Sequence, residues 1–285
     1  MNLLQFLYLV ATPIGNLGDI SQRAIDTLCS VDFIAAEDTR VSAKLLNHYH
    51  IKKPVLSYHQ HNAQGRGEEI VNRILAGESC AVVTDAGTPC ISDPGEELVK
   101  LCAENKIPVI AIPGPNAAIS ALAASGLPSG RFSFEGFLSV KKTGRIAHLN
   151  EIKDDARTLV FYEAPHKLLR TLKDMCEVLG DRRVSLAREL TKIHEEIVRT
   201  TLSEAAAYYE ENTPRGEFVI VVEGKKPEDL PRVDLSDAVK IMEDLIENGE
   251  KPAAAARRAA RETGYRKNEI YRHITGIKSD SKKKM

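Results

Sequence analysis

The chain has 285 residues, of which 43% are hydrophobic and 28% are charged, so it can fill two ordinary domain cores. Its 39 basic and 40 acidic residues give a net charge of −1. No overall positive field would therefore draw it onto nucleic acid, and any RNA contact must come from local patches. The five cysteines show neither a C-x-x-C pair nor metal-ligand spacing, and the apolar run near the start is too short to span a bilayer. We expect a cytoplasmic protein with reduced thiols, no bound metal and no membrane contact.

The first half of the chain alternates short apolar runs with longer amphipathic stretches. This alternation predicts an α/β fold whose first domain, residues 1–136, carries a mainly parallel sheet. Helical spacing is clearest in Gln64–Ala76 and Gly95–Asn105. Each apolar run ends in a loop with glycine, proline, aspartate or threonine, and ligands bind at such carboxyl ends in open α/β sheets. The expected strands are Phe6–Ala11, Val31–Ala36, Pro54–Tyr58, Cys80–Thr84 and Val109–Ile112.

A second α/β domain is expected over residues 137–226. The glycines and bases of Glu135–Arg145 predict a hinge between the two domains. Charges alternate through Glu195–Thr200, which favours a half-exposed strand and therefore a mixed or antiparallel second sheet. The other expected strands are Arg157–Tyr162, Arg183–Arg188 and Glu217–Glu223, with helices at His166–Leu179 and Ser203–Glu210.

The last part of the chain, residues 227–285, is predicted to be a linker followed by a small basic helical unit. Gly224–Arg232 holds two prolines and five charges, a composition typical of a linker. Helices are expected at Leu235–Asn248, Pro252–Thr263 and Lys267–Gly276. This unit carries the strongest charge asymmetry of the chain.

Two loops with glycine and proline directly after strands are candidates for ligand binding. The sequence lacks the phosphate-loop, dinucleotide, H-E-x-x-H and G-x-S-x-G motifs, which counts against phosphoryl transfer, hydride transfer and serine hydrolysis. TDAGTPCISDPG (84–95) instead contains Gly87, whose missing Cβ lets a flat ligand approach the backbone. In IPGPNAA (112–118), Asn116 is placed to cap a helix. Turn formation and helix packing alone would also explain both loops.

Two polar loops offer candidate catalytic side chains. AAEDTR (35–40) sets Glu37, Asp38 and Arg40 after an apolar strand, where a carboxylate could orient a hydroxyl or take its proton. The alternative is that Asp38 caps a helix with Arg40 as its ion-pair partner. His59 and His61 of YHQHN lack a third metal ligand, which favours polar surface or substrate contact over metal binding.

Taken together, these blocks form a family pattern. TPIGNLGD, AAEDTR, TDAGTPCISDPG, PGPNAA, EGF, FYEAPHK, ARELTK and GEFVIVVEG follow one another in this order between residues 12 and 224. They closely resemble the ribosomal RNA small-subunit methyltransferase I family, the cytidine 2′-O-methyltransferases among the tetrapyrrole methylases. The resemblance implies two α/β domains of the tetrapyrrole-methylase type, a C-terminal helical unit, a homodimer, and S-adenosylmethionine bound in the cleft between the domains.

The resemblance also implies a reaction and its residues. The reaction would be in-line methylation of a cytidine 2′-hydroxyl in small-subunit (16S) ribosomal RNA or a 30S particle. For the group that takes or orients the proton of that hydroxyl, our own candidates from the AAEDTR loop are Asp38 or Glu37, with Arg40 nearby. The implied cofactor contacts are Pro13, Asp85, Ala86, Gly87, Thr88, Ile91, Asn116, Ala117, Tyr162, Glu163, Leu190, Glu217 and Phe218. The phosphate contacts expected from local charge are Lys141, Lys142, Arg145, Arg257, Arg258, Arg261, Arg266, Lys267 and Arg272.

Two other functions stay open on the sequence alone. One is a methyltransferase of the same fold that acts on a precorrin or uroporphyrinogen, because fold does not decide function. The other is a non-catalytic ribosome-binding protein that keeps a degenerate cofactor cleft. The basic C-terminal helices favour RNA over a macrocycle, and the intact Gly87 and Thr88 argue against a decayed cleft. Neither DNA nor a membrane is expected as a partner.

Overall fold

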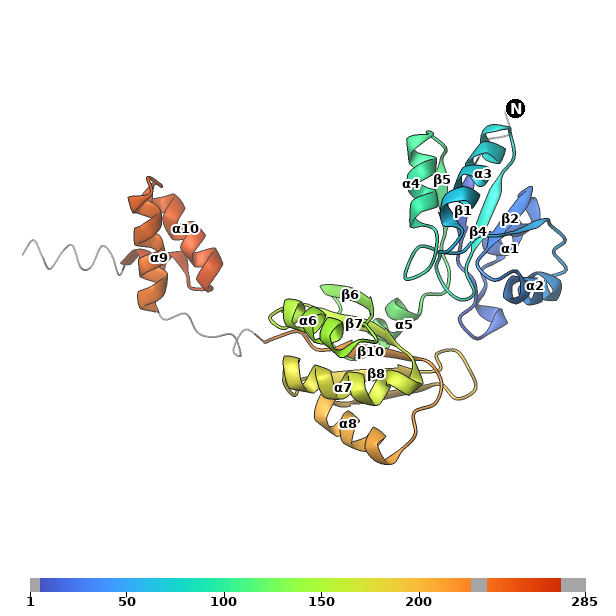
Figure 1. Cartoon of the computed structure of the whole chain (residues 1–285). Coiled ribbons are helices and arrows are strands. Elements are labelled where there is room, and N and C mark those ends of the chain that lie inside the picture. The colour runs from blue at the N-terminus through green and yellow to red at the C-terminus, as the bar shows by residue number, and fades with distance from the viewer. Residues whose placement is uncertain (1–5, 227–234, 273–285) are drawn as a thin grey trace, which may run out of the picture. The chain divides into compact units, whose positions relative to one another are not determined.

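The computed structural model describes residues 6–226 and 235–272, and the chain divides between residues 225 and 226 into two compact units (Figure 1). The first unit contains two five-stranded sheets, and the second is built from helices. No helix in these two ranges has both the length and the apolarity needed to span a membrane. The predicted α/β class with two sheets and C-terminal helices is confirmed.

The first sheet is parallel throughout, in the order β3-β2-β4-β1-β5. Both of its faces are covered: Phe33 and Ala35 of β2 pack under one pair of helices, whereas Ile34 and Ala36 pack under the other pair. Burial on both faces explains why these strands are continuous apolar runs. The strands are β1 Leu7–Val10, β2 Phe33–Ala36, β3 Val55–Ser57, β4 Cys80–Val83 and β5 Val109–Ile112. Helices α3 Ala63–Leu75 and α4 Glu96–Glu104 cover one face, and α1 Gln22–Ser30 and α2 Thr39–His48 the other, with a 3-10 turn at Leu17–Asp19.

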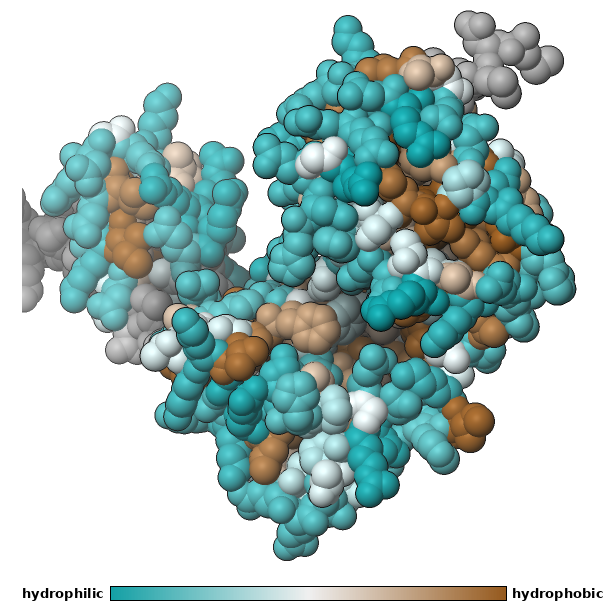
Figure 2. Space-filling view, turned by 45° about the vertical axis from the view of Figure 1, so that its right-hand side comes forward, coloured by the Kyte–Doolittle hydropathy of each residue, from teal (hydrophilic) through white to brown (hydrophobic). Residues whose placement is uncertain are grey.

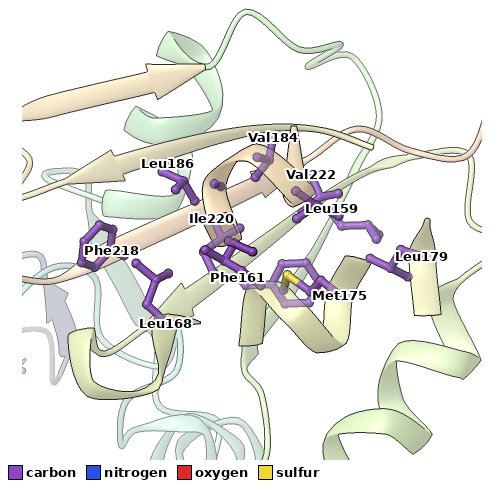
Figure 3. Packing of buried hydrophobic residues seen from close by; sticks show 14 of the residues in the cluster. Leu159, Phe161, Leu168, Met175, Leu179, Val184, Leu186, Phe218, Ile220 and Val222 are labelled. Carbon is purple, nitrogen blue, oxygen red and sulfur yellow. The ribbon is translucent and has the colours of Figure 1, made fainter. Parts of the chain in front are cut away.

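The second sheet is mixed, as predicted, in the order β6-β7-β10-β8-β9, where β6 and β7 are parallel and the other neighbours antiparallel. Phe161 and Ile220 of this sheet pack against Leu168 and Met175 of a helix in the core drawn in Figure 3. The strands are β6 Phe132–Phe137, β7 Thr158–Glu163, β8 Arg183–Arg188, β9 Glu196–Thr201 and β10 Phe218–Val222. Helices α6 Lys142–Ile152, α7 Pro165–Leu179 and α8 Leu202–Glu211 supply this core, and α5 Ala117–Ala124 covers the opposite face.

The segment Glu135–Arg145 is not a hinge, so that prediction is wrong. Its first residues complete β6, which pairs with β7, and its last residues begin α6. The ladder with β7 pairs one side of the β6 backbone and fixes the strand on the second sheet. The connection between the sheets runs instead through residues 113–131, which include α5.

The second unit contains α9 Leu235–Glu247, α10 Pro252–Thr263 and a helical stretch at residues 267–272. Its core consists of alanines and larger aliphatic side chains, among them Ala238, Met242, Ala256 and Ile270. The expected helices are present, although the end of the third prediction, residues 273–276, lies outside the described residues, as do residues 227–232 of the expected linker.

Arg145 has a structural role that the sequence did not indicate. It is only 4% exposed, its Nε donates to Asp174 Oδ2 at 2.6 Å, and its Nη1 donates to the Ser139 carbonyl oxygen at 2.9 Å. These contacts fasten the turn between β6 and α6 to α7. A buried, paired guanidinium cannot reach a phosphate, so Arg145 does not serve as the RNA contact predicted from its charge.

Replacing this buried arginine should destabilise the protein. Arg145→Met is expected to lower the free energy of unfolding by about 3–5 kcal/mol, because it leaves Asp174 buried without its main partner. The exposed neighbour Lys141→Met should change it by less than about 0.5 kcal/mol. Urea unfolding followed by circular dichroism compares the two, and equally small effects would contradict the structural role.

Candidate functional site

Three loops at the carboxyl ends of β1, β4 and β5 are tied to one another by hydrogen bonds. Thr12 and Gly87 exchange two backbone hydrogen bonds, with N···O distances of 2.8 and 3.0 Å, and Thr12 Oγ1 donates to the Thr84 carbonyl oxygen at 3.0 Å. Gly87 has a φ of +88°, a conformation that glycine adopts without the steric strain of a Cβ. The predicted need for glycine in this loop therefore has a backbone reason.

The third loop connects both sheets. Thr88 Oγ1 donates to the Pro115 carbonyl oxygen at 3.1 Å. Asn116 caps α5, as predicted, by accepting a hydrogen bond from the Ile119 amide at 3.0 Å. One residue into the helix, the Ala118 amide donates to the hydroxyl of Tyr162 on β7 at 3.3 Å. The start of α5 thus joins the loops of the first sheet to the second sheet.

A cavity of about 350 Å³ lies between the carboxyl-end loops of the first sheet and the second sheet, a size typical of small-molecule sites, which range over roughly 300–1,000 Å³. Side chains of low polarity gather in the hollow between the two sheets (Figure 2). Every residue expected to contact the cofactor lines this cavity except Pro13, whose neighbour Ile14 does so instead. The cavity also takes in Ser92, Asp93, Phe137 and Lys192, which the sequence did not single out as cofactor contacts.

The second sheet closes the cavity with an ion-paired loop. Lys192 Nζ contacts Glu189 Oε1 at 2.9 Å and Glu217 Oε2 at 3.1 Å, while Glu189 Oε1 accepts from the Glu217 amide at 3.0 Å. The aliphatic part of Lys192 lies against Gly15 of the first sheet, where an added Cβ would come within 2.5 Å of the lysine Cγ. This loop therefore reaches across the cavity to the loop after β1.

Three carboxyl groups face the cavity from the loops of the first sheet. None of them is ion-paired with Lys192, the basic residue of the cavity lining. Glu37 ends β2, and Asp85 and Asp93 belong to the loop after β4. Burial and the neighbouring acids raise the pKa of Glu37 and of Asp85. Burial and the charge of Glu37 raise the pKa of Asp93 to about 7. Such raised values are typical of functional sites. Asp93 was missed from sequence although it lies in the TDAGTPCISDPG block, because an acid before proline looks like a turn residue.

Asp38 and Arg40 do not line the cavity. Asp38 caps α2 by accepting from the Arg40 amide at 2.8 Å, and its Oδ2 contacts Arg40 Nη2 at 2.6 Å. These hydrogen bonds from Arg40 lower the pKa of Asp38 to about 2. The structure thus shows the capping arrangement that was the alternative for this motif, and of the three candidate catalytic residues only Glu37 reaches the cavity.

The remaining basic candidates are exposed. Lys141 and Lys142 lie where the turn after β6 leads into α6, close in sequence to the cavity residue Phe137. Arg257, Arg261, Arg266, Lys267 and Arg272 are exposed on the second unit. Arg258 is exposed too, but its guanidinium contacts Glu250 and Glu262.

The chain has close relatives among characterised protein families. The sequence profile of the tetrapyrrole (corrin/porphyrin) methylases matches residues 6–206. The chain belongs to the tetrapyrrole methylase family. It is 49% identical over 275 residues to the ribosomal RNA small subunit methyltransferase I of Synechocystis, which covers 96% of this chain and 99% of that protein. The protein of the same name from Haemophilus influenzae is 48% identical over 268 residues, covering 93% and 94% of the two chains.

Solved structures of tetrapyrrole methylases share the fold. A cobalt precorrin-4 methyltransferase superposes with a TM-score of 0.58 at 19% identity, covering 77% of this chain and 95% of its own. The uroporphyrin-III-C-methyltransferase of Thermus thermophilus gives 0.53 at 18%, covering 76% and 94%. At these identities the likeness shows the fold alone.

The cavity of this tetrapyrrole methylase suits a ligand that carries positive charge and a flat ring. Apolar walls from Ile14, Ile91 and Leu190 can face a ring, and the Asp85–Thr88 backbone is presented beside them. Its charged lining is Glu37, Asp85, Asp93, Glu163, Glu189 and Glu217 against Lys192. This excess of carboxylates favours a cation such as the sulfonium and ammonium groups of S-adenosylmethionine. Within the described ranges, no three His, Cys, Asp or Glu side chains are grouped to hold a metal ion.

The cavity-closing loop depends on a glycine. Gly216 has a φ of +80°, and an added Cβ would lie 2.7 Å from Glu189 Oε1. Gly216→Ala should therefore lower the free energy of unfolding by more than about 1 kcal/mol. Gly65→Ala, in α3 with open space around it, should raise stability by about 0.5–1 kcal/mol. Thermal unfolding measures both, and shifts of the same sign would contradict this reading.

Proposed function

We propose that this protein transfers a methyl group from S-adenosylmethionine to the ribose 2′-hydroxyl of a cytidine in small-subunit (16S) ribosomal RNA. The observation that carries the proposal is the match to proteins named ribosomal RNA small subunit methyltransferase I, which extends over 96% of the chain and so includes the basic C-terminal unit. We also propose that it acts in the cytoplasm as a homodimer, on free ribosomal RNA or on a 30S particle.

The cavity residues account for how the cofactor would be held. Asp85 to Thr88 would present backbone groups, Tyr162 and Leu190 would pack against the adenosine, and Glu37 and Asp85 would attract the positive groups. When bound, S-adenosylmethionine supplies a methyl carbon that a hydroxyl oxygen can attack. The chain must hold that oxygen roughly 3–3.5 Å from its target, and such positioning can contribute about 7–11 kcal/mol.

The attacking hydroxyl also needs a proton acceptor. A ribose hydroxyl is a weak acid, and a general base typically adds about 10²–10⁴-fold in rate. Of the acids proposed from sequence, Glu37 is in the cavity, whereas Asp38 is held by Arg40 outside it. We therefore propose the carboxylates of the cavity, not Asp38, for this role, and Arg40 forms its ion pair with Asp38.

The second unit would bind the RNA backbone. Its exposed arginines and lysines supply local positive charge on a chain whose net charge is −1, and binding through phosphate contacts does not require a positive protein as a whole. The two structural neighbours named for tetrapyrrole methylation cover 76–77% of this chain, whereas the Synechocystis and Haemophilus influenzae relatives named for ribosomal RNA cover 96% and 93% of it. This difference favours RNA over a porphyrinoid acceptor.

The proposal is tested by methyl transfer. Tritium from labelled S-adenosylmethionine should enter small ribosomal subunits prepared from cells lacking this protein, and nuclease digestion with mass spectrometry should identify 2′-O-methylcytidine. Cofactor binding with label in a porphyrinoid but none in RNA would favour a tetrapyrrole methyltransferase. RNA binding without cofactor binding, measured by thermal stabilisation, would favour a non-catalytic ribosome-binding protein.

Charge removal tests the RNA contacts. Arg257→Gln with Arg261→Gln should weaken binding to the ribosomal RNA segment and reduce the slope of log affinity against log salt by about 1.4, for two lost contacts to single-stranded phosphates. Lys52→Gln with Lys106→Gln removes the same charge at the amino ends of β3 and β5, the edge opposite the cavity, and should leave the slope unchanged. Equal slopes for both double variants would contradict a role for the second unit.

A further inference from the structure

A second cavity adjoins the first across a shared wall. It has a volume of about 440 Å³ and lies between the loop after β3, the start of α4 and the end of β2. Glu37, Ser92 and Asp93 line both cavities. Two ligands, one bound in each cavity, would therefore lie next to each other beside these three residues.

The lining of the second cavity differs from that of the first. Gln60, His59 and His61 supply hydrogen-bonding groups, and the aromatic rings of the two histidines lie 6.0 Å apart. Hydrogen-bonding side chains and flat rings are what a protein uses to hold an unpaired nucleotide. The first cavity instead has the apolar walls of Ile14, Ile91 and Leu190, which do not line the second, so the two cavities suit different ligands.

His59 is held in one orientation. The Asn62 side-chain oxygen accepts from the His59 amide at 2.9 Å, so the Asn62 nitrogen must donate to the Ser57 carbonyl oxygen at 3.2 Å and to His59 Nε2 at 3.3 Å. Nε2 is then an acceptor, and the neutral ring carries its hydrogen on Nδ1. Nδ1 is buried and has no hydrogen-bond partner among the described residues. Such an unpaired donor costs about 1–3 kcal/mol and is rare in native structures, where buried polar groups are nearly all hydrogen-bonded.

The shared wall is also conformationally strained. Cys90 and Ser92 have φ values of +71° and +63°, in a region that non-glycine residues rarely occupy. Strain of this kind persists where the surrounding structure fixes the backbone, and it clusters at active sites. Here it carries Asp93 to the boundary between the cavities.

We propose that the second cavity receives the acceptor nucleotide and that Asp93 takes the proton of the hydroxyl that is methylated. This inference rests on the proposed function. In the step, the hydroxyl oxygen bonds to the methyl carbon, its proton passes to the Asp93 carboxylate, and the electron pair of the broken carbon–sulfur bond stays on sulfur. His59 and His61 contact the nucleotide, and Glu37 adjusts the basicity of Asp93.

The surroundings of Asp93 agree with this assignment. Burial and the Glu37 carboxylate raise its pKa to about 7, near the value at which a general base is most effective at neutral pH. Because the base must be deprotonated, the rate should be low below this pKa and rise as the pH passes through it. The other groups that face this wall are Asp85, His59, His61, Tyr162, Glu96, Glu97 and Cys90.

Single-turnover methyl transfer with saturating cofactor tests the role of Asp93. The rate of the unaltered protein should rise with pH through about 7, and Asp93→Asn should lower the rate at saturating cofactor about 10²–10⁴-fold. Glu104→Gln, an exposed acid at the end of α4, is the matched control and should behave like the unaltered protein. Cofactor binding by Asp93→Asn shows that the variant is folded.

Glu37→Gln gives a second, independent readout. Removing the Glu37 charge should lower the pKa of Asp93, so the rising part of the pH profile should move to lower pH. A structural role for Asp93 would not produce this shift. Loss of the rate in Glu37→Gln with a normal rate in Asp93→Asn would overturn the assignment and make Glu37 the base.

His61→Gln tests the nucleotide cavity. It should raise the KM for ribosomal RNA about two- to tenfold, as expected for one hydrogen bond, with the rate at saturating RNA and the cofactor affinity unchanged. His48→Gln is the matched control, because His48 is exposed on α2, and it should leave the KM, the rate and the cofactor affinity unchanged. An unchanged KM in His61→Gln would overturn the cavity assignment while leaving the methyltransferase function intact. Absence of RNA methylation by the unaltered protein would overturn the proposed function and this inference together.

Discussion

The pair of backbone hydrogen bonds between Thr12 and Gly87 is the constraint on which the site depends. It holds the loop after β4 against the loop after β1, and it requires the left-handed φ of Gly87. With Gly87 fixed, Thr88 reaches the Pro115 carbonyl oxygen, and the Asp85 side chain accepts from the Asp38 amide. Four loops from separate strands thereby become one surface, because these hydrogen bonds form only when the loops lie together.

The two sheets contribute different chemistry to that surface. The parallel sheet ends in loops that bring the Asp85–Thr88 backbone and the acids with raised pKa values, whereas the mixed sheet supplies the Tyr162 ring and the ion-paired loop around Lys192. Helix α5 connects the two roles. Its first turn is capped by Asn116 beside the loops of the first sheet, and its small residues pack on β7 and β10. Alanine at these positions permits the close approach that keeps the cavity narrow.

Acidic and basic residues are concentrated in different parts of the chain, although its net charge is only −1. The cavity concentrates carboxyl groups, and their burial and mutual repulsion raise the pKa values of Glu37, Asp85 and Asp93. Exposed basic residues are gathered on α10 and after it. A site that attracts a cation and a unit that attracts phosphate can then coexist in one protein, since screening confines each field to about 10 Å.

The sequence by itself determined the α/β class, the parallel and mixed sheets and the loops that line the cavity. These follow from local causes: apolar runs buried on both faces, and glycine and proline where strands end. Only the tertiary structure decided the role of individual side chains. Arg145 and Lys141 are near neighbours with the same charge, yet burial beside Asp174 makes the first structural. Asp38 and Asp93 are both acids in strand-end loops, yet Arg40 holds one outside the cavity while Glu37 faces the other within it. The end of β6 was taken for part of a hinge because its pairing with β7 is a contact between residues distant in sequence, which no local pattern records.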